Sequence, residues 1–160
     1  MANTYTQLYV HVVFAVKGRS NLVSPKWKER LYQYISGIIT NENQKLMIIN
    51  GMPDHLHLLI GLKPDCTLSG LVRDIKANSS KWINEQKFIM GKFEWQTGFG
   101  AFTVGQSQLQ TVINYILNQE NHHCKKTFRE EYVEFLNAYN INFKTEYLLE
   151  DFGIAPPELK

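Results

Sequence analysis

The sequence predicts an α+β fold, an antiparallel sheet of the ferredoxin-like or RRM-like kind with helices on one face. Strand-like runs, rich in β-branched and aromatic residues, alternate with runs of helical periodicity in the order strand, helix, strand, strand, helix, strand. Two more helical runs follow. We therefore expect the first two helices to cover one face, leaving the other for a ligand, a partner or the additional C-terminal helices.

Each expected element has local support in the sequence. Ser24 and Thr67 can cap the first two helices, and Pro25 suits the first position of a helix. Strands are expected at residues 7–16, 45–51, 55–62 and 101–105. Helices are expected at residues 25–40, 68–86, 107–123 and 127–140.

Length and composition indicate one globular domain. The chain has 160 residues, of which 44% are hydrophobic and 20% charged. We expect one domain over residues 1–152 and a flexible tail over 153–160. No apolar run approaches the roughly 18 residues that span a bilayer, and no signal segment is visible, so we expect no membrane contact and a cytoplasmic location. The two cysteines are expected to be free thiols.

Charge is unevenly distributed along the chain. Residues 1–129 contain 15 Lys and Arg against 8 Asp and Glu, whereas residues 130–160 contain 2 against 7. A basic body is compatible with a polyanionic ligand, but an uneven soluble surface would have the same composition.

Two histidines interrupt an apolar strand-like run. In "HLHLLIGL" His55 and His57 are two residues apart, so a strand would place both imidazoles on one face and Leu56 and Leu58 on the other. If the leucines lie beneath the helices, the imidazoles face the open side and can share a divalent ion. Two half-exposed histidines that bond only to water or neighbours remain the alternative.

A second pair of polar residues lies in the third helical run. In "INYILNQENHH" Tyr115 and Gln119 are four apart, one turn along the same face of a helix. A tyrosine hydroxyl beside an amide that can bind metal is a plausible nucleophile and ligand pair. An ordinary boundary tyrosine is the alternative for Tyr115 alone.

Together these motifs resemble a known family. "MPDHLHLLIGL" is similar to the HUH motif (His, bulky hydrophobe, His) of the single-tyrosine transposases of bacterial insertion sequences and of their relatives associated with repetitive palindromic elements. "YILNQ" resembles the tyrosine and glutamine of that family's catalytic helix. Weaker similarity in "YVHVVFAVKGR", "LVRDIKANSSKWI" and "GFGAFTVG" extends the resemblance over roughly residues 5 to 135.

The resemblance implies a strand transferase for single-stranded DNA. Such enzymes cut and rejoin insertion-sequence ends, often recognised as hairpins, through a 5′-phosphotyrosine intermediate. Carried over to this chain, Tyr115 would be the nucleophile on the additional catalytic helix, and His55, His57 and Gln119 would bind Mg²⁺ or Mn²⁺. The family typically acts as a homodimer, in which the tyrosine helix of one subunit serves the histidines of the other.

Several further residues are candidates for supporting roles. Asp54 follows Pro53 and either orients a metal ligand or only forms the turn. His11 either contacts DNA or packs within the first strand. The candidates for contacts with the DNA backbone are Lys17, Arg19, Arg73, Lys76 and Lys81, and a solvated helix face is the alternative for them. Trp95, Phe99 and Phe102 would stack on unpaired bases or pack in the core.

Two other functions remain compatible with the sequence. One is a non-catalytic module that binds single-stranded nucleic acid on the open face of the sheet. The other is an HxH metal-dependent hydrolase without a covalent step. Neither alternative requires Tyr115 as a nucleophile, which separates both from the transposase.

Overall fold

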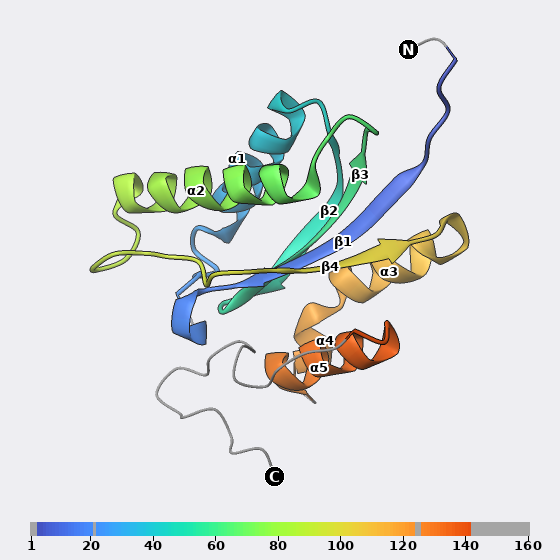
Figure 1. Cartoon of the computed structure of the whole chain (residues 1–160). Helices are drawn as coiled ribbons and strands as arrows, with labels where there is room; N and C mark the ends of the chain where they lie inside the picture. The colour runs from blue at the N-terminus through green and yellow to red at the C-terminus, as the bar shows by residue number, and fades with distance from the viewer. Residues whose placement is uncertain (1–2, 21, 124–125, 142–160) are drawn as a thin grey trace.

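The four strand-like runs form one sheet. The computed structural model describes residues 3–20, 22–123 and 126–141. The strands are β1 (Leu8–Ala15), β2 (Lys45–Met52), β3 (His55–Leu62) and β4 (Gly100–Val104). All neighbours are antiparallel, in the order β2-β3-β1-β4. The predicted fold class is thereby confirmed, and the two central strands are those expected to carry the histidines (Figure 1).

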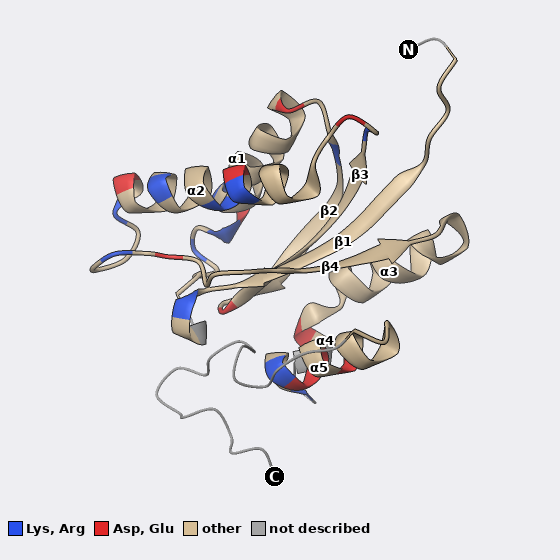
Figure 2. Cartoon of the chain, viewed as in Figure 1, with Lys and Arg blue, Asp and Glu red and all other residues tan. Residues whose placement is uncertain are grey.

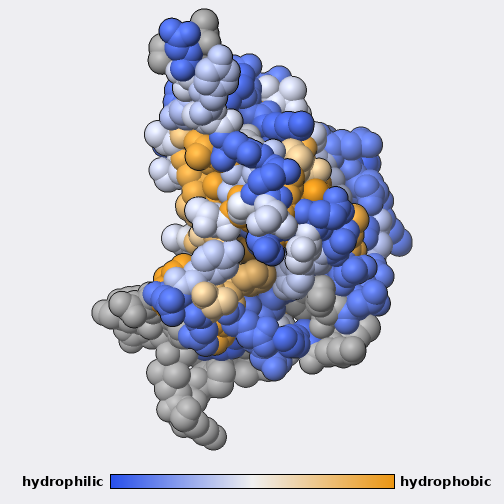
Figure 3. Space-filling view, turned by 90° about the vertical axis from the view of Figure 1, so that its right-hand side faces the viewer, coloured by the Kyte–Doolittle hydropathy of each residue, from blue (hydrophilic) through white to orange (hydrophobic). Residues whose placement is uncertain are grey.

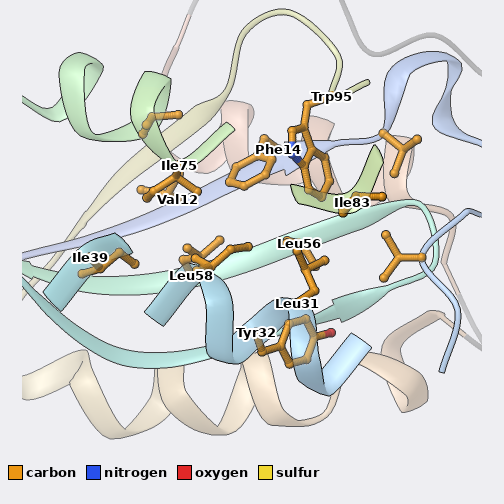
Figure 4. Close-up of a cluster of buried hydrophobic side chains, with 14 of the residues drawn as sticks. Val12, Phe14, Leu31, Tyr32, Ile39, Leu56, Leu58, Ile75, Ile83 and Trp95 are labelled. Carbon is orange, nitrogen blue, oxygen red and sulfur yellow. The ribbon is translucent and has the colours of Figure 1, made fainter. Parts of the chain in front are cut away.

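Helices α1 (Lys28–Asn41) and α2 (Leu68–Gln86) cover one face of the sheet. Alternate residues of β1 and β3, among them Phe14, Leu56 and Leu58, point into the apolar core beneath these helices (Figure 4). Trp95, from the loop before β4, packs edge-on against Phe14 with ring centroids 4.8 Å apart. Each large side chain buried here stabilises the fold by about 1.5–3 kcal/mol.

The first helix begins later than the sequence predicted. α1 starts at Lys28 rather than at Pro25, because Ser24 caps a preceding turn instead. Its hydroxyl oxygen accepts a hydrogen bond from the Lys26 backbone at 3.1 Å, and its carbonyl accepts from the backbone N–H groups of Trp27 and Lys28.

The opposite face is covered by the C-terminal helices. These are α3 (Leu109–Leu117), α4 (Gln119–His123) and α5 (Phe128–Ala138), and Figure 1 shows them beneath the sheet, on the side away from α1 and α2. Two short 3-10 helices, η1 (Lys17–Arg19) and η2 (Gln106–Gln108), follow β1 and β4. The face that the sequence left for a ligand, a partner or extra helices is therefore occupied by the extra helices.

The expectation of one continuous helix over residues 107–123 is wrong. The chain leaves helical geometry at Asn118 (φ −94°, ψ 25°), which separates α3 from α4. The side chain of Asn50 on β2 donates hydrogen bonds to the carbonyls of Ile116 and Leu117, at 2.9 and 3.3 Å. In a continuous helix those carbonyls would accept from N–H groups one turn later. The contact with the sheet therefore stabilises the break.

One face of the molecule shows mainly hydrophilic residues. Seen from the right-hand side of Figure 1, hydrophobic residues gather at mid-height between hydrophilic regions (Figure 3). Within the described ranges, no helix has both the length and the apolar character needed to cross a membrane. The tail expected at residues 153–160 lies outside the described residues.

Candidate active site

A tight hairpin between β2 and β3 positions the first histidine. Pro53 and Asp54 alone connect the paired ends of the two strands. An added Cβ on Gly51 would collide with the His55 carbonyl oxygen, so only glycine allows this close approach. The backbone N–H of Val16 donates to the Asp54 carbonyl at 2.9 Å, which ties the turn to the end of β1.

Both histidines point to the face covered by α3–α5. This is the shared face predicted from the strand period, and Leu56 and Leu58 occupy the opposite core as expected. His55 and His57 are 0% exposed, and their ring centroids are 5.1 Å apart. Two half-exposed, solvated histidines are therefore excluded. Buried imidazoles require partners for both ring nitrogens.

Asp54 and His11 hold the outward ring nitrogens of the pair. His55 Nδ1 lies 2.6 Å from Asp54 Oδ1, and His57 Nδ1 lies 2.8 Å from His11 Nε2. Burial, with a smaller contribution from the charge of His57, lowers the pKa of His11 to about 3, so His11 is neutral and can accept a hydrogen bond. Both Nδ1 atoms are therefore assigned as N–H donors, which leaves the lone pair of each histidine on Nε2.

The break between α3 and α4 presents Tyr115 and Gln119 to the histidines. Gln119 is fully buried, and its Oε1 lies 3.2 Å from His55 Nε2. Tyr115 is partly exposed, and its ring meets the ring of His57 edge-on at 5.9 Å between centroids. One chain thus brings together the tyrosine, the glutamine and both histidines that the sequence singled out.

Glu131 on α5 completes the cluster, and sequence reasoning missed it. Its Oε1 lies 3.1 Å from His57 Nε2 and 3.7 Å from His55 Nε2. Its other oxygen accepts a hydrogen bond from the hydroxyl of Tyr115. The carboxylate is 4% exposed, and burial, the largest cause, raises the pKa of Glu131 to about 7.

One sequence signal could have identified Glu131. It lies three residues after Phe128 and four before Phe135, and both aromatic rings face the sheet side of α5. An acidic residue within the apolar stripe of an amphipathic helix is unusual, because burying an unpaired carboxylate is costly. That position should have predicted a buried partner for the carboxylate.

The donor set of this cluster fits a divalent cation. With the protons assigned to Nδ1, each histidine presents a lone pair on Nε2 to an oxygen acceptor, on Gln119 for His55 and on Glu131 for His57. Lone pairs that face each other at about 3 Å require a proton or a cation between them. Ligand atoms of His55, His57 and Glu131 all lie within 4.8 Å of one another. Imidazole nitrogens with amide or carboxylate oxygens suit Mn²⁺ or Mg²⁺.

The predicted DNA-backbone residues on α2 lie on the opposite face of the sheet from this cluster, whereas Lys17 comes two residues after Ala15, the β1 residue that pairs with His55. Figure 2 shows Lys and Arg on α2, on the loop that follows it and on η1, whereas α5 carries several acidic residues. Lys17 pairs with Glu94 at 3.0 Å, and Arg73 and Lys81 are exposed on α2. Lys76 is half-buried and donates to two loop carbonyls. The side chain of Arg19 lies outside the described residues.

The aromatic candidates divide between core and surface. Trp95 and Phe102 are 9% and 2% exposed, on opposite faces of the sheet, so core packing accounts for both. Phe99 is partly buried and lies in the loop before β4. His11 is likewise a packed strand residue.

A split βαβ sheet with a His-hydrophobe-His pair on its central strand, facing a helical tyrosine, defines the single-tyrosine HUH class. The chain belongs to the family described as "Transposase IS200 like", whose sequence profile matches residues 4–119. It is therefore a DNA-processing enzyme of the transposase type. The matched region includes His55, His57, Tyr115 and Gln119, but not Glu131.

Individual relatives agree with this membership. The chain is 22% identical over 120 residues to the ISDra2 transposase TnpA of Deinococcus radiodurans, covering 72% of this chain and 86% of the relative. It is 24% identical over 127 residues to the transposase for insertion sequence element IS200 of Salmonella typhimurium, covering 75% and 84%.

Two solved structures share the fold. One is a putative transposase from Deinococcus radiodurans, with a TM-score of 0.59 and 24% identity over 73% of this chain and 94% of that chain. The other is a REP-associated tyrosine transposase bound to a REP hairpin, with a TM-score of 0.60 and 14% identity over 99% and 97%.

Proposed function

We propose that this transposase cuts and rejoins single-stranded DNA at insertion-sequence ends, using Tyr115 as the nucleophile. The observation that carries the proposal is the convergence on Glu131, which hydrogen-bonds the Tyr115 hydroxyl and lies 3.1 Å from His57 Nε2. The proposed nucleophile and the candidate metal site thus share one buried group. The solved relative that holds a REP hairpin supports hairpin DNA as the substrate.

In the proposed reaction, the Tyr115 oxygen attacks the scissile phosphorus. A P–O bond forms to tyrosine while the P–O bond to the 3′ oxygen breaks, which gives a 5′-phosphotyrosine and a free 3′-hydroxyl. The phenol proton leaves toward Glu131, which already accepts a hydrogen bond from it, and the departing 3′ oxygen takes up a proton. One phosphodiester replaces another, so attack by a new 3′-hydroxyl rejoins DNA without an added energy source.

The metal would be Mg²⁺ or Mn²⁺, held by His55, His57 and oxygens of Gln119 or Glu131. When bound it supplies charge neutralisation for the phosphate that Tyr115 attacks. Asp54 and His11 fix the two rings so that each Nε2 faces inward. The resemblance implied Gln119 as the third ligand. Glu131 offers a second oxygen at a similar distance from a histidine: its Oε1 lies 3.1 Å from His57 Nε2, and Gln119 Oε1 lies 3.2 Å from His55 Nε2.

The tyrosine acts on the histidines of its own chain in this proposal. Tyr115 already lies against His57 and Glu131 without a second subunit. The expected homodimer stays a separate prediction, and it is not required to bring these residues together.

The test is a cleavage assay on single-stranded oligonucleotides that contain the palindromes flanking the gene. With Mn²⁺, a 3′-labelled strand should become covalently attached to protein on a denaturing gel, and a 5′-labelled strand should be shortened to a product with an extendable 3′-hydroxyl. Tyr115→Phe should abolish the adduct. Tyr139→Phe is the matched control, because the Tyr139 hydroxyl donates to the Thr103 carbonyl, away from the histidines.

The alternatives give different results in the same assay. Cleavage that survives Tyr115→Phe would indicate an HxH metal-dependent hydrolase without a covalent step. DNA that is retarded on a native gel but never cut would indicate a non-catalytic single-strand binder. Either outcome overturns the proposed function.

A further inference from the structure

Asn50 lies beside His57, on the neighbouring strand. The two residues are paired in the antiparallel register of β2 and β3. Directly opposite residues point to the same face of a sheet, with Cβ atoms about 5 Å apart, so Asn50 lies on the face that holds the candidate active site. Asparagine is depleted in strands, and the four residues of β2 before it are all apolar. Packing alone therefore does not account for an amide at this position.

The side-chain amide of Asn50 bonds the end of the helix that carries the tyrosine. It donates to the carbonyls of Ile116 and Leu117, at 2.9 and 3.3 Å. These are the first and second residues after Tyr115, and α3 ends at Leu117. The last carbonyls of a helix have no partner within the helix, so a side chain that supplies N–H groups satisfies them. The amide thus fixes the chain one residue beyond the proposed nucleophile.

The apolar packing of α3 is less specific than this contact. Ile116 is the one fully buried side chain of the helix. Its other apolar residues on the sheet side are only partly buried, namely Leu109, Val112 and Ile113. Apolar contacts are non-directional, so they resist a small slide or rotation of the helix weakly, whereas hydrogen bonds depend on both distance and direction. At its other end α3 follows η2 and β4 along the chain, so Asn50 fixes the end that carries Tyr115.

We propose that Asn50 is a positioning residue for the cleavage reaction. Its amide sets where α3 ends on the sheet, and thereby holds the Tyr115 hydroxyl against Glu131 and the tyrosine ring against His57. Asn50 acts through the helix and binds neither the metal nor the DNA. A displacement of about 1 Å at a reacting group slows a reaction about a hundredfold, so a small slip of α3 is sufficient. The role in catalysis rests on the proposed function.

The test separates the rate of the chemical step from binding. With Mn²⁺ and the palindrome-containing strand both saturating, Asn50→Leu should slow adduct formation about tenfold to a hundredfold, because it removes the amide donors with little change in volume. Asn50→Gln keeps an amide on a longer arm and should react at least about threefold faster than Asn50→Leu. DNA affinity in EDTA should stay within about twofold, as expected when only the transition state is affected. The rise in Tm with Mn²⁺ should persist, because the histidines on β3 keep their places.

Ile49→Ala is the matched control for a general loss of stability. Ile49 is the preceding residue of β2 and packs against the apolar core on the opposite face. Its truncation should lower the free energy of unfolding, while the rate of adduct formation per folded molecule stays within about twofold. Thermal melts of both variants show how much of each protein is folded in the rate assay.

Hydrogen exchange gives a readout that needs neither metal nor DNA. In the full-length protein, Asn50→Leu should speed amide exchange in the peptide that covers residues 109–117 about tenfold, and leave β1 and β3 unchanged. Ile49→Ala should not speed exchange in α3 selectively. This measurement reports whether the amide holds the helix, independently of any reaction.

Each possible result bears on the inference. It is overturned by an unchanged rate in Asn50→Leu, by equal slowing in Ile49→Ala, or by unchanged exchange in α3. A loss of DNA affinity that accounts for the whole change in rate would make Asn50 a binding residue instead. If the unsubstituted protein forms no adduct, the proposed function fails, and exchange alone then decides whether Asn50 holds α3. Failure of the inference is therefore distinguishable from failure of the cleavage proposal.

Discussion

The two faces of the sheet are made by the same strands but bury different chemistry. On the α1/α2 side β3 contributes Leu56 and Leu58 to an apolar core. On the α3–α5 side the intervening His55 and His57 are equally buried, yet they contact a carboxylate and an amide. Apolar burial stabilises the fold outright, whereas buried polar groups only offset their own desolvation. The α3–α5 face also has apolar packing of its own, around Phe102, Phe128 and Ile116, so what distinguishes it is the polar cluster set within that packing.

The largest effect is expected from His57→Ala on the polar face. It removes a proposed metal ligand, so formation of the covalent DNA adduct should fall by about a thousandfold or more, since such an ion supplies several kcal/mol in the transition state. In a thermal melt, Mn²⁺ should raise the Tm of the unsubstituted protein but not that of the variant. If the variant still forms the adduct and Mn²⁺ still raises its Tm, His57 is not a ligand of the metal.

Leu58→Ala, one residue along the same strand, should have the opposite effects: it should lower stability and leave Mn²⁺ binding intact. Its side chain is 0% exposed in the apolar core, so truncation should lower the free energy of unfolding by about 2–5 kcal/mol. The Mn²⁺-induced rise in Tm and the activity of the folded fraction should persist. Denaturant melts with and without Mn²⁺ measure both quantities. If the variant is fully folded but Mn²⁺ no longer raises its Tm, the apolar core and the metal site do not act independently.

Sequence periodicity predicted which residues of β3 share a face, but not which residues of the C-terminal helices pack against the histidines. The two-residue repeat fixes which side chains share a face, so the placement of His55 and His57 followed directly. Glu131 could not be placed, because its approach depends on how α5 docks, 74 positions along the chain from His57. The helix break at Asn118 was missed for a similar reason, since the stabilising contact comes from Asn50 on β2. Local patterns predict faces, and long-range packing decides which residues meet across them.

The smallest effect is expected from Asp54, which holds a proposed metal ligand in place but does not itself bind the metal. Asp54 bonds the outward nitrogen of His55 at 2.6 Å and is 20% exposed. Asp54→Ala should therefore preserve the fold and weaken Mn²⁺ binding about tenfold to a hundredfold, the usual range when a metal-bound histidine loses its partner. Asp54→Asn keeps an oxygen acceptor and should lose less.

Asp74→Ala on α2 is the matched control, because this acid lies on the other face. Isothermal titration with Mn²⁺ measures all three, and equal affinity in Asp54→Ala would show that Asp54 only forms the turn. The graded order of alanine, asparagine and aspartate is what distinguishes orientation of the ring from simple loss of negative charge, since both substitutions remove the charge but only alanine removes the acceptor.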